Sequence, residues 1–354
     1  MRRAGLALIA ALLLAACGGA ARPAPSGAVS PAGASSSAPT GAPASAPATA
    51  PASVPVQFSY PQPTSGFMPL WLAQDSGLFQ NYGLATEMFN LPAPTDLQAL
   101  QSGEVQFAFE GGAAIAAIAG GADLTFVAVL ANHYAQQLFT NTPEIQSTRD
   151  LVGKSIAASS PGASSDGALR SILKHEGIAP SDVNVVYLRD DHSIFGGLQT
   201  GAVQAAILTK ATIPLARQQG YRLLVDANDL KLPTVNVGIV VRRDWARQNP
   251  DAVLAFLQGV MDATKRAKDD PAAAKAEIQK YSRLDDPAQI DQVYVDSLDW
   301  APYPLAQDAG VQTLLDLSTD EQVKAHQPTD FYDNSYLLRL QDWVKGLYPE
   351  GVPE

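Results

Sequence analysis

Short β-like runs alternate with helical segments from residue 56 to residue 226. In the first half, strands are predicted at 56–60, 85–89, 105–109 and 124–130, with helices at 68–76, 95–101 and 113–119. In the second half, strands are predicted at 155–158, 183–188, 204–208 and 222–226, with helices at 165–175, 193–199 and 213–218. This alternation predicts an α/β fold with mixed, mostly parallel sheets that helices cover on both faces.

An internal echo divides this pattern into two similar halves. Residues 100–106 read LQSGEVQ and residues 198–204 read LQTGAVQ. Each copy combines a helix end, a glycine suited to the left-handed position after a helix, and a strand that begins soon afterwards. An Ala-rich helix, glycine and a hydrophobic strand follow each copy. The repeated order predicts two lobes of similar build.

Composition limits the classes of function. The chain has 354 residues, of which 46% are hydrophobic and 17% charged, with a net charge of −11. Beyond residue 55 the length is enough for about two domains. An acidic chain without basic clusters argues against nucleic acid as a partner.

The N-terminal region reads as an export signal. Arg2 and Arg3 precede an apolar run over 4–16, which is too short for a membrane-spanning helix. The run ends in Leu-Ala-Ala-Cys, which resembles a bacterial lipobox, so Cys17 is the expected lipidation site. Because Cys17 is the sole cysteine, neither a disulfide nor a cysteine metal site is expected.

A tether is predicted over 18–55. This stretch consists almost entirely of Ala, Pro, Ser, Gly and Thr and contains no aromatic residue. It buries too little apolar surface to offset its ordering entropy. We therefore expect a disordered leash that holds the folded part away from a membrane.

Several motifs, taken together and in order, resemble one known family. They are PLWLAQDSGLF at 69–79 with YGL at 82–84, the two LQxGxV copies, RDLVGKSIA at 149–157, Gly-Ile at 177–178 and NPDAVLAFL at 249–257. The chain resembles the sulfonate/nitrate/taurine-type substrate-binding proteins of ABC importers, which also include proteins of thiamine-pyrimidine supply. Gln106 and Gln204 stand where that family usually has Asp.

The resemblance implies a two-lobed periplasmic-binding-protein-like fold of type 2. The first lobe would comprise 56–141 plus 234–354, with C-terminal helices from Asp244 onward packed on it, and the second lobe 142–233. Residues 139–141 and 235–238 would be the hinges. The implied function is capture of a small solute, which an ABC permease then accepts. We expect a monomer without cofactor or metal, at the cell surface or in the periplasm and held to the membrane through its lipid alone.

Ligands of open α/β sheets bind beyond the carboxyl ends of strands, often at helix N-termini. That rule selects Ser65, Gly66, Phe67, Glu110, Gly111 and Gly112 in the first lobe, and Gly162, Ala163, Ser164, Ser165, Asp190, His192, Thr209 and Lys210 in the second. The loop at 161–166 is the strongest candidate, since the resemblance also implies a ligand near this helix start. Asn236, Asn132 and His133 are further candidates near the crossover.

Carboxylates leave the charge of the solute open. Glu110, Asp166 and Asp190 lie at or beside the selected loops, and unpaired carboxylates disfavour a bound anion. A thiamine-pyrimidine precursor or a related neutral or cationic heterocycle is therefore an alternative, with Phe67 or Tyr134 stacked on it.

The sequence offers little support for two other classes of function. An enzyme similar to those of thiamine-pyrimidine synthesis is disfavoured because residues 162–167 narrowly miss the Gly-x-Ser-x-Gly pattern, and no two of the four histidines have metal-ligand spacing. A scaffold or sensor that binds a protein partner would need a large exposed apolar patch. We therefore predict a binding protein without catalytic residues.

Overall fold

The computed structural model describes residues 53–92, 94–318 and 320–353. The expected signal sequence, Cys17 and most of the tether lie outside these residues. Strand β1 begins at Val54, so residues 54 and 55, assigned above to the tether, belong to the folded part. Within the described ranges, no helix combines the length and apolar character needed to cross a membrane.

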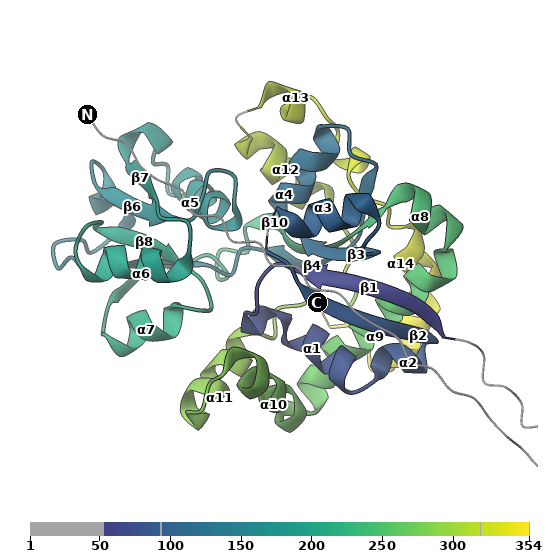
Figure 1. Cartoon of the computed structure of the whole chain (residues 1–354). Helices are drawn as coiled ribbons and strands as arrows, with labels where there is room; N and C mark the ends of the chain where they lie inside the picture. The colour runs from purple at the N-terminus through teal and green to yellow at the C-terminus, as the bar shows by residue number, and fades with distance from the viewer. Residues whose placement is uncertain (1–52, 93, 319, 354) are drawn as a thin grey trace, which may run out of the picture. The chain divides into compact units, whose positions relative to one another are not determined.

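Two five-stranded sheets form the two lobes (Figure 1). The first sheet has the order β2-β1-β3-β10-β4, built from β1 (Val54–Tyr60), β2 (Leu84–Asn90), β3 (Phe107–Glu110), β4 (Leu124–His133) and β10 (Pro233–Arg242). The second has the order β7-β6-β8-β5-β9, built from β5 (Gln137–Thr140), β6 (Ser155–Ala158), β7 (Asn184–Tyr187), β8 (Ala205–Leu208) and β9 (Arg222–Asp226). The predicted α/β class and two-lobed build are confirmed.

The sheets are mixed and mostly parallel, as predicted. In each sheet the first three strands pair in parallel, whereas the fourth strand runs antiparallel to both neighbours. These fourth strands, β10 and β5, are the ones that follow a crossover from the other lobe. Because the chain enters β10 and β5 from the opposite lobe, these two strands run antiparallel to the other strands of their sheets.

The echo occupies equivalent places in the two sheets. β3 and β8 both take the third position, and Gly103 and Gly201 precede them with φ of 83° and 74°. Gln106 Oε1 accepts from the backbone N–H of Gln57 (2.7 Å) on β1, as Gln204 Oε1 does from Ser155 (3.0 Å) on β6. The two glutamines therefore make the same strand contact in both lobes.

The crossovers lie outside the segments predicted as hinges. β4 ends at His133 and β5 begins at Gln137, while β9 ends at Asp226 and β10 begins at Pro233. The predicted hinge segments instead lie in or directly after β5 and within β10, where ladder hydrogen bonds on both sides restrain the backbone. Residues 134–136 and 227–232 make the connections, so the first change of lobe comes before the predicted residue 141.

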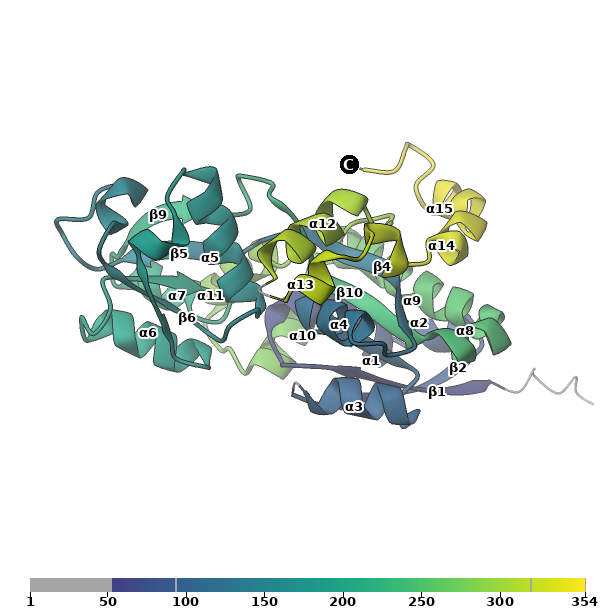
Figure 2. The same cartoon turned by 90° about the horizontal axis from the view of Figure 1, so that it is seen from above.

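Helices cover both faces of the first sheet (Figure 2). One face carries α1 (Met68–Asp75), α2 (Leu78–Asn81), α8 (Arg243–Gln248), α9 (Pro250–Asp269), α10 (Pro271–Ser282), α11 (Pro287–Asp296), α14 (Ser335–Arg339) and α15 (Gln341–Leu347). The other carries α3 (Thr95–Ser102), α4 (Gly112–Ala119), α12 (Asp308–Leu317) and α13 (Glu321–Lys324). Alternate residues of β10 explain this division, because Ile239 faces the α9 side and Val240 the α4 side.

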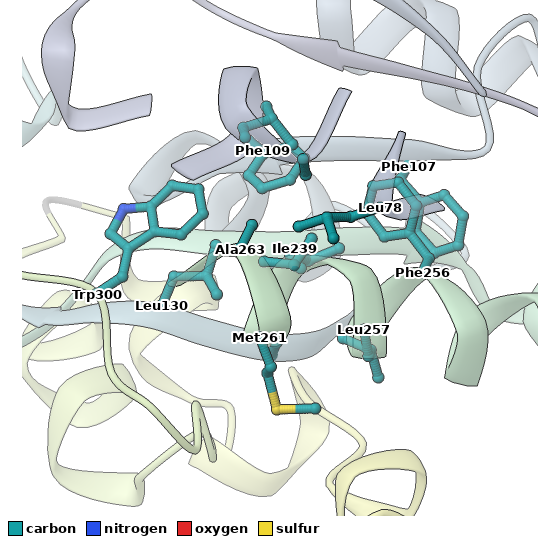
Figure 3. Close-up of a cluster of buried hydrophobic side chains, with 14 of the residues drawn as sticks. Leu78, Phe107, Phe109, Leu130, Ile239, Phe256, Leu257, Met261, Ala263 and Trp300 are labelled. Atoms are coloured by element: carbon teal, nitrogen blue, oxygen red, sulfur yellow. The ribbon is translucent and has the colours of Figure 1, made fainter. Parts of the chain in front are cut away.

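Aromatic packing fixes α9 against the first sheet (Figure 3). Phe256 of α9 stacks on Phe107 of β3 with ring centroids 3.9 Å apart, and on Phe79 at 4.9 Å. These side chains are almost completely buried, and each contributes about 1.5–3 kcal/mol by leaving water. Phe109 of β3 also packs on Phe256, with centroids 6.2 Å apart, so this core anchors the strand whose last residue is Glu110.

The second lobe has the same layered build. Its sheet is covered by α5 (Ser164–His175) on one face and by α6 (Asp191–Gln199) and α7 (Ile213–Gln218) on the other. Side chains of β6 alternate between the two cores, with Ile156 facing α5 and Ala157 facing α6. Four short 3-10 helices complete the described part at Ser65–Phe67, Thr148–Leu151, Pro180–Asp182 and Pro328–Asp330.

Candidate functional site

A cavity of about 540 Å³ lies where the two lobes face each other, and we call it the interlobe cavity. Of the residues selected from the sequence, thirteen line it: Gly66, Phe67, Glu110, Gly111, Gly112, Gly162, Ala163, Ser164, Ser165, Asp190, Thr209, Lys210 and Asn236. Ser65 is buried beside it, and His192 is exposed on the first turn of α6, so neither lines it.

The starts of α4 and α5 meet at the interlobe cavity. A Cβ on Gly112, the first residue of α4, would lie 3.3 Å from the carbonyl oxygen of Gly162, just before α5. A Cβ on Gly111 would lie 2.8 Å from the carbonyl oxygen of Asn236 on β10. Glycine at these positions lets the backbones approach, and both helices bring free N–H groups of their first turns to the interlobe cavity.

A short chain of polar side chains joins the lobes at the same place. Gln136, in the first crossover, donates from Nε2 to Ser164 Oγ (2.7 Å), and Ser164 Oγ donates to Asn236 Oδ1 (2.5 Å). The chain therefore links a crossover, the start of α5 and β10. Two amides surround the Ser164 hydroxyl, and neither is a base that would activate a serine nucleophile.

Asp166 does not present a free charge to the interlobe cavity. Its Oδ2 accepts from the Gly162 N–H (2.9 Å) and from Arg170 Nε (2.9 Å), while the Tyr187 hydroxyl donates to Oδ1 (3.0 Å). The side chain is buried and ion-paired, so its charge is compensated. Asp166 therefore stabilises the loop that precedes α5.

Asp190 and Glu110 carry the other two carboxyls that the sequence places at the selected loops. Asp190 caps α6 by accepting from the N–H and the hydroxyl of Ser193, and these hydrogen bonds lower the pKa of Asp190. Burial, together with the neighbouring carboxyl of Asp96, raises the pKa of Glu110 to about 9. Glu110 is therefore neutral at pH 7. The expectation of three unpaired carboxylates is thus corrected for Asp166 and Glu110, whereas Asp190 keeps its negative charge at the lining.

Ion pairs across the lobes flank the interlobe cavity. Lys210, after β8, pairs with Asp299 at 2.8 Å, and Arg217 on α7 pairs with Asp296 on α11 at 3.3 Å. Lys210 was selected above as a ligand-contacting residue, and its partner in this structure is Asp299. Both side chains of that pair are about 15% exposed, which places them at the wall of the interlobe cavity.

Arg189 is the exposed cation on the lining. It follows β7, is exposed, and forms no ion pair with any residue in the described ranges. Its φ of 65° is left-handed, an uncommon conformation for a residue other than glycine. Backbone strain of this kind concentrates at ligand-contacting positions.

Aromatic side chains form an apolar wall. Trp300 packs on Phe109 (centroids 6.0 Å) and on Phe67 (6.4 Å), and all three line the interlobe cavity. Tyr134, proposed above as a stacking residue, instead lies in the core of the second lobe. His133 bonds to Asn132 and to Asn228 at the crossover, and neither His133 nor Asn132 lines the interlobe cavity.

Several lining residues lie outside the loops that the strand-end rule selected. They are Pro61, Gln62, Pro92, Phe109, Ala135, Gln136, Ser159, Val237, Asp299 and Trp300. Thr64, Ala113, Ser160, Arg189 and Asp191 also line the interlobe cavity and lie within the selected loops, but they were not singled out as ligand contacts. Asp299 and Trp300 lie in irregular chain between α11 and α12, where no strand end marks them. Arg189 and Asp191 lie in a loop that the strand-end rule did find, so the sequence contained a signal for these two residues.

Residues 64–274 match the NMT1/THI5 like family of proteins. A taurine-binding periplasmic protein of Escherichia coli (strain K12) is 30% identical over 172 residues, covering 47% of this chain and 52% of that protein. The chain thus matches about half the length of this curated relative.

Solved structures share the fold over most of the chain. The periplasmic aliphatic sulphonate-binding protein of Escherichia coli has a TM-score of 0.67 at 24% identity, covering 80% of this chain and 99% of that chain. The periplasmic nitrate-binding protein of Synechocystis PCC 6803 has a TM-score of 0.63 at 14% identity, covering 86% and 92%. The predicted periplasmic-binding-protein-like architecture is therefore confirmed.

Proposed function

Because this chain belongs to the NMT1/THI5-like family, we propose that it is an extracytoplasmic solute-binding protein that captures a small organic or inorganic oxyanion and delivers it to an ABC importer. The observation that carries the proposal is the interlobe cavity, in which two helix starts from different lobes meet. Capture needs no bond to be made or broken. The partners of the Ser164 hydroxyl are amides, which do not activate it as a nucleophile, and this is consistent with capture.

The lining suits an oxyanion group joined to a carbon skeleton. First-turn N–H groups of α4 and α5 and the guanidinium of Arg189 are donors for the anion. Phe67, Phe109 and Trp300 offer an apolar surface for the carbon part. Taurine, aliphatic sulphonates and nitrate, named for the relatives above, all carry an oxyanion group.

A heterocycle related to thiamine pyrimidine is the second candidate. The aromatic wall would stack on a flat ring, and the Asp299 carboxylate would accept from its N–H groups. The anion is favoured because Asp299 is already paired with Lys210 and because Glu110 is neutral.

A panel of solutes tests this choice. We expect ethanesulfonate, taurine or nitrate to raise the melting temperature of the folded domain, and ethylamine and aminopyrimidines to leave it unchanged. A solute at a hundredfold excess over its Kd stabilises the native state by about 2.7 kcal/mol. Stabilisation by the pyrimidines alone would favour the heterocycle over the anion as the solute. Turnover of any solute would instead support an enzymatic function.

Tryptophan fluorescence supplies a matched control for the same panel. Trp300 lines the interlobe cavity, whereas Trp343 lies on α15 and does not. Trp300→Phe should remove the fluorescence change on solute binding, and Trp343→Phe should keep it. The reverse pattern would count against binding in the interlobe cavity.

We also propose that the protein is a lipoprotein anchored through Cys17, outside the membrane that carries its permease. The support is the Leu-Ala-Ala-Cys motif after the apolar run, followed by the Ala/Pro/Ser-rich stretch. Cys17→Ser should move the protein from the membrane fraction to the soluble fraction of its host. Unchanged membrane association of this variant would refute the lipid anchor.

A further inference from the structure

One ion pair on α5 connects the interlobe cavity to a second cavity. Arg170 lines the second cavity, which has a volume of about 710 Å³ and lies between α5 and the segment of α12 and α13. Asp166, four residues earlier on α5, accepts from the N–H of Gly162, which lines the interlobe cavity. The anion of the pair therefore contacts the wall of the interlobe cavity, while its cation is open to the second cavity.

Both oxygens of the Asp166 carboxylate are engaged. Oδ2 accepts from Arg170 Nε (2.9 Å) as well as from Gly162 (2.9 Å), and Oδ1 accepts from the Tyr187 hydroxyl (3.0 Å). Arg170 Nη2 also donates to the Tyr187 hydroxyl oxygen (3.3 Å), so the three side chains form a closed ring. The side chain of Asp166 is 3% exposed and that of Arg170 26%. A carboxylate buried this deeply depends on its partner for charge compensation, because water does not reach it.

The first turn of α5 is left free for a solute. Ala163 occupies the N-cap position, and no described side chain caps this helix. Asp166 bonds to Gly162, which lies before the helix, and not to an N–H of the first turn. The positive end of α5 therefore keeps its donors at the interlobe cavity. A carboxylate in that turn would oppose this positive field if no cation balanced it.

Arg170 is the cation that provides this balance. Among the described residues it is the ion-pair partner of Asp166. Lys174, one turn further along α5, instead pairs with Asp316 of α12 at 3.7 Å, and its side chain is 73% exposed. The charge of Asp166 is thus compensated by one side chain that does not itself line the interlobe cavity.

We propose that Arg170 is a positioning residue that sets the charge preference of the interlobe cavity by neutralising Asp166. The inference rests on the proposed capture of an anion. Without the guanidinium, a buried negative charge would remain in contact with Gly162 and would repel an anion at the first turn of α5. With the guanidinium in place, the anion meets the unopposed donors of that turn.

Two variants that break the same ion pair test the proposal. Arg170→Gln leaves the negative charge, whereas Asp166→Asn leaves the positive charge and retains an oxygen that accepts from Gly162. A purely structural role of the pair predicts similar losses of affinity in both. We expect Arg170→Gln to bind at least about tenfold more weakly than the wild type, and Asp166→Asn to bind at least about tenfold more tightly than Arg170→Gln.

The measurement is calorimetry with ethanesulfonate, and with nitrate alongside, at pH 8. This pH lies well above the range in which carboxyl groups ordinarily titrate. Lys265→Gln is the matched control, because Lys265 pairs with Asp269 at the same spacing on α9 and does not line the interlobe cavity. It removes one positive charge from the chain and should leave the affinity unchanged.

The double variant Arg170→Gln/Asp166→Asn removes both charges. It should regain most of the affinity that Arg170→Gln loses, although it carries one more substitution. Urea denaturation shows which variants are folded. If Arg170→Gln does not fold, Asp166→Asn should still bind several-fold more tightly than the double variant, because it keeps the positive charge.

The outcomes separate this inference from the proposed function. Equal losses in Arg170→Gln and Asp166→Asn, or no recovery in the double variant, would overturn the role of Arg170 while anion capture by the wild type stands. Absence of binding of both ethanesulfonate and nitrate to the wild type would reject anion capture, and this inference with it.

Discussion

Gly162→Trp is expected to reduce solute affinity by about 100-fold or more while the domain stays folded. A Cβ at Gly162 would meet no atom within 4 Å, and the residue lines the interlobe cavity beside the start of α5. An indole placed there would occupy the space that the solute needs. Isothermal calorimetry with the solute that stabilises the wild type most would measure the loss.

Gly162→Ala is the matched control for this variant. Gly162 has a φ of 76°, so either substitution is strained and costs about 1–2 kcal/mol of stability. The methyl group adds the same strain without filling the interlobe cavity, so affinity should stay within a few-fold of the wild type. Equal affinity of the Trp variant and the wild type would exclude this loop from the binding site.

Gly111→Ala is expected to destabilise the fold by about 1–3 kcal/mol and to weaken solute binding by more than tenfold. A Cβ at this position would lie 2.8 Å from the carbonyl oxygen of Asn236 and 2.9 Å from that of Val235, and both are backbone atoms of β10. The start of α4 must then move away from β10. Urea denaturation and calorimetry would measure the two losses.

Gly196→Ala tests whether any glycine replacement would have the same effect. Gly196 lies within α6, and a Cβ there would meet no atom within 4 Å. Alanine should therefore stabilise the protein by about 0.5–1 kcal/mol, because glycine loses more conformational freedom on folding. If Gly111→Ala were as stable as the wild type, the close approach of α4 to β10 would not matter for the fold.

The features that the sequence predicted well are local. Between residues 56 and 226, strand and helix periodicity located most elements to within a few residues. The LQxGxV echo predicted two lobes of similar build, and the two sheets have equivalent strand orders. The rule that ligands bind at strand ends selected most of the loops that line the interlobe cavity. Each of these signals can be recognised in a short stretch of sequence, and the echo adds only a comparison of two such stretches.

The features that the sequence did not predict depend on contacts between distant segments. β5 pairs with β8 and β9 of a sheet whose other strands come later in the chain, so periodicity alone gave no reason to place it there. Asp299 becomes a site residue only through its pairing with Lys210. Asp166 is different, since Arg170 lies four residues away on a predicted helix and that spacing favours an ion pair.

The state of the carboxyls bears on the choice between the solute classes. Acidic residues at the loops left a cationic or neutral guest as an alternative, whereas in the structure Asp166 is paired with Arg170 and burial beside Asp96 raises the pKa of Glu110. The charge that a bound solute meets thus depends on partners that the sequence order does not reveal.

The most direct measurement is a crystal structure of the complex with the solute that stabilises the protein most. We expect one solute molecule in contact with both lobes, its oxyanion at the first turns of α4 and α5 and its carbon part against Trp300. A solute bound to one lobe alone, or outside the interlobe cavity, would contradict it.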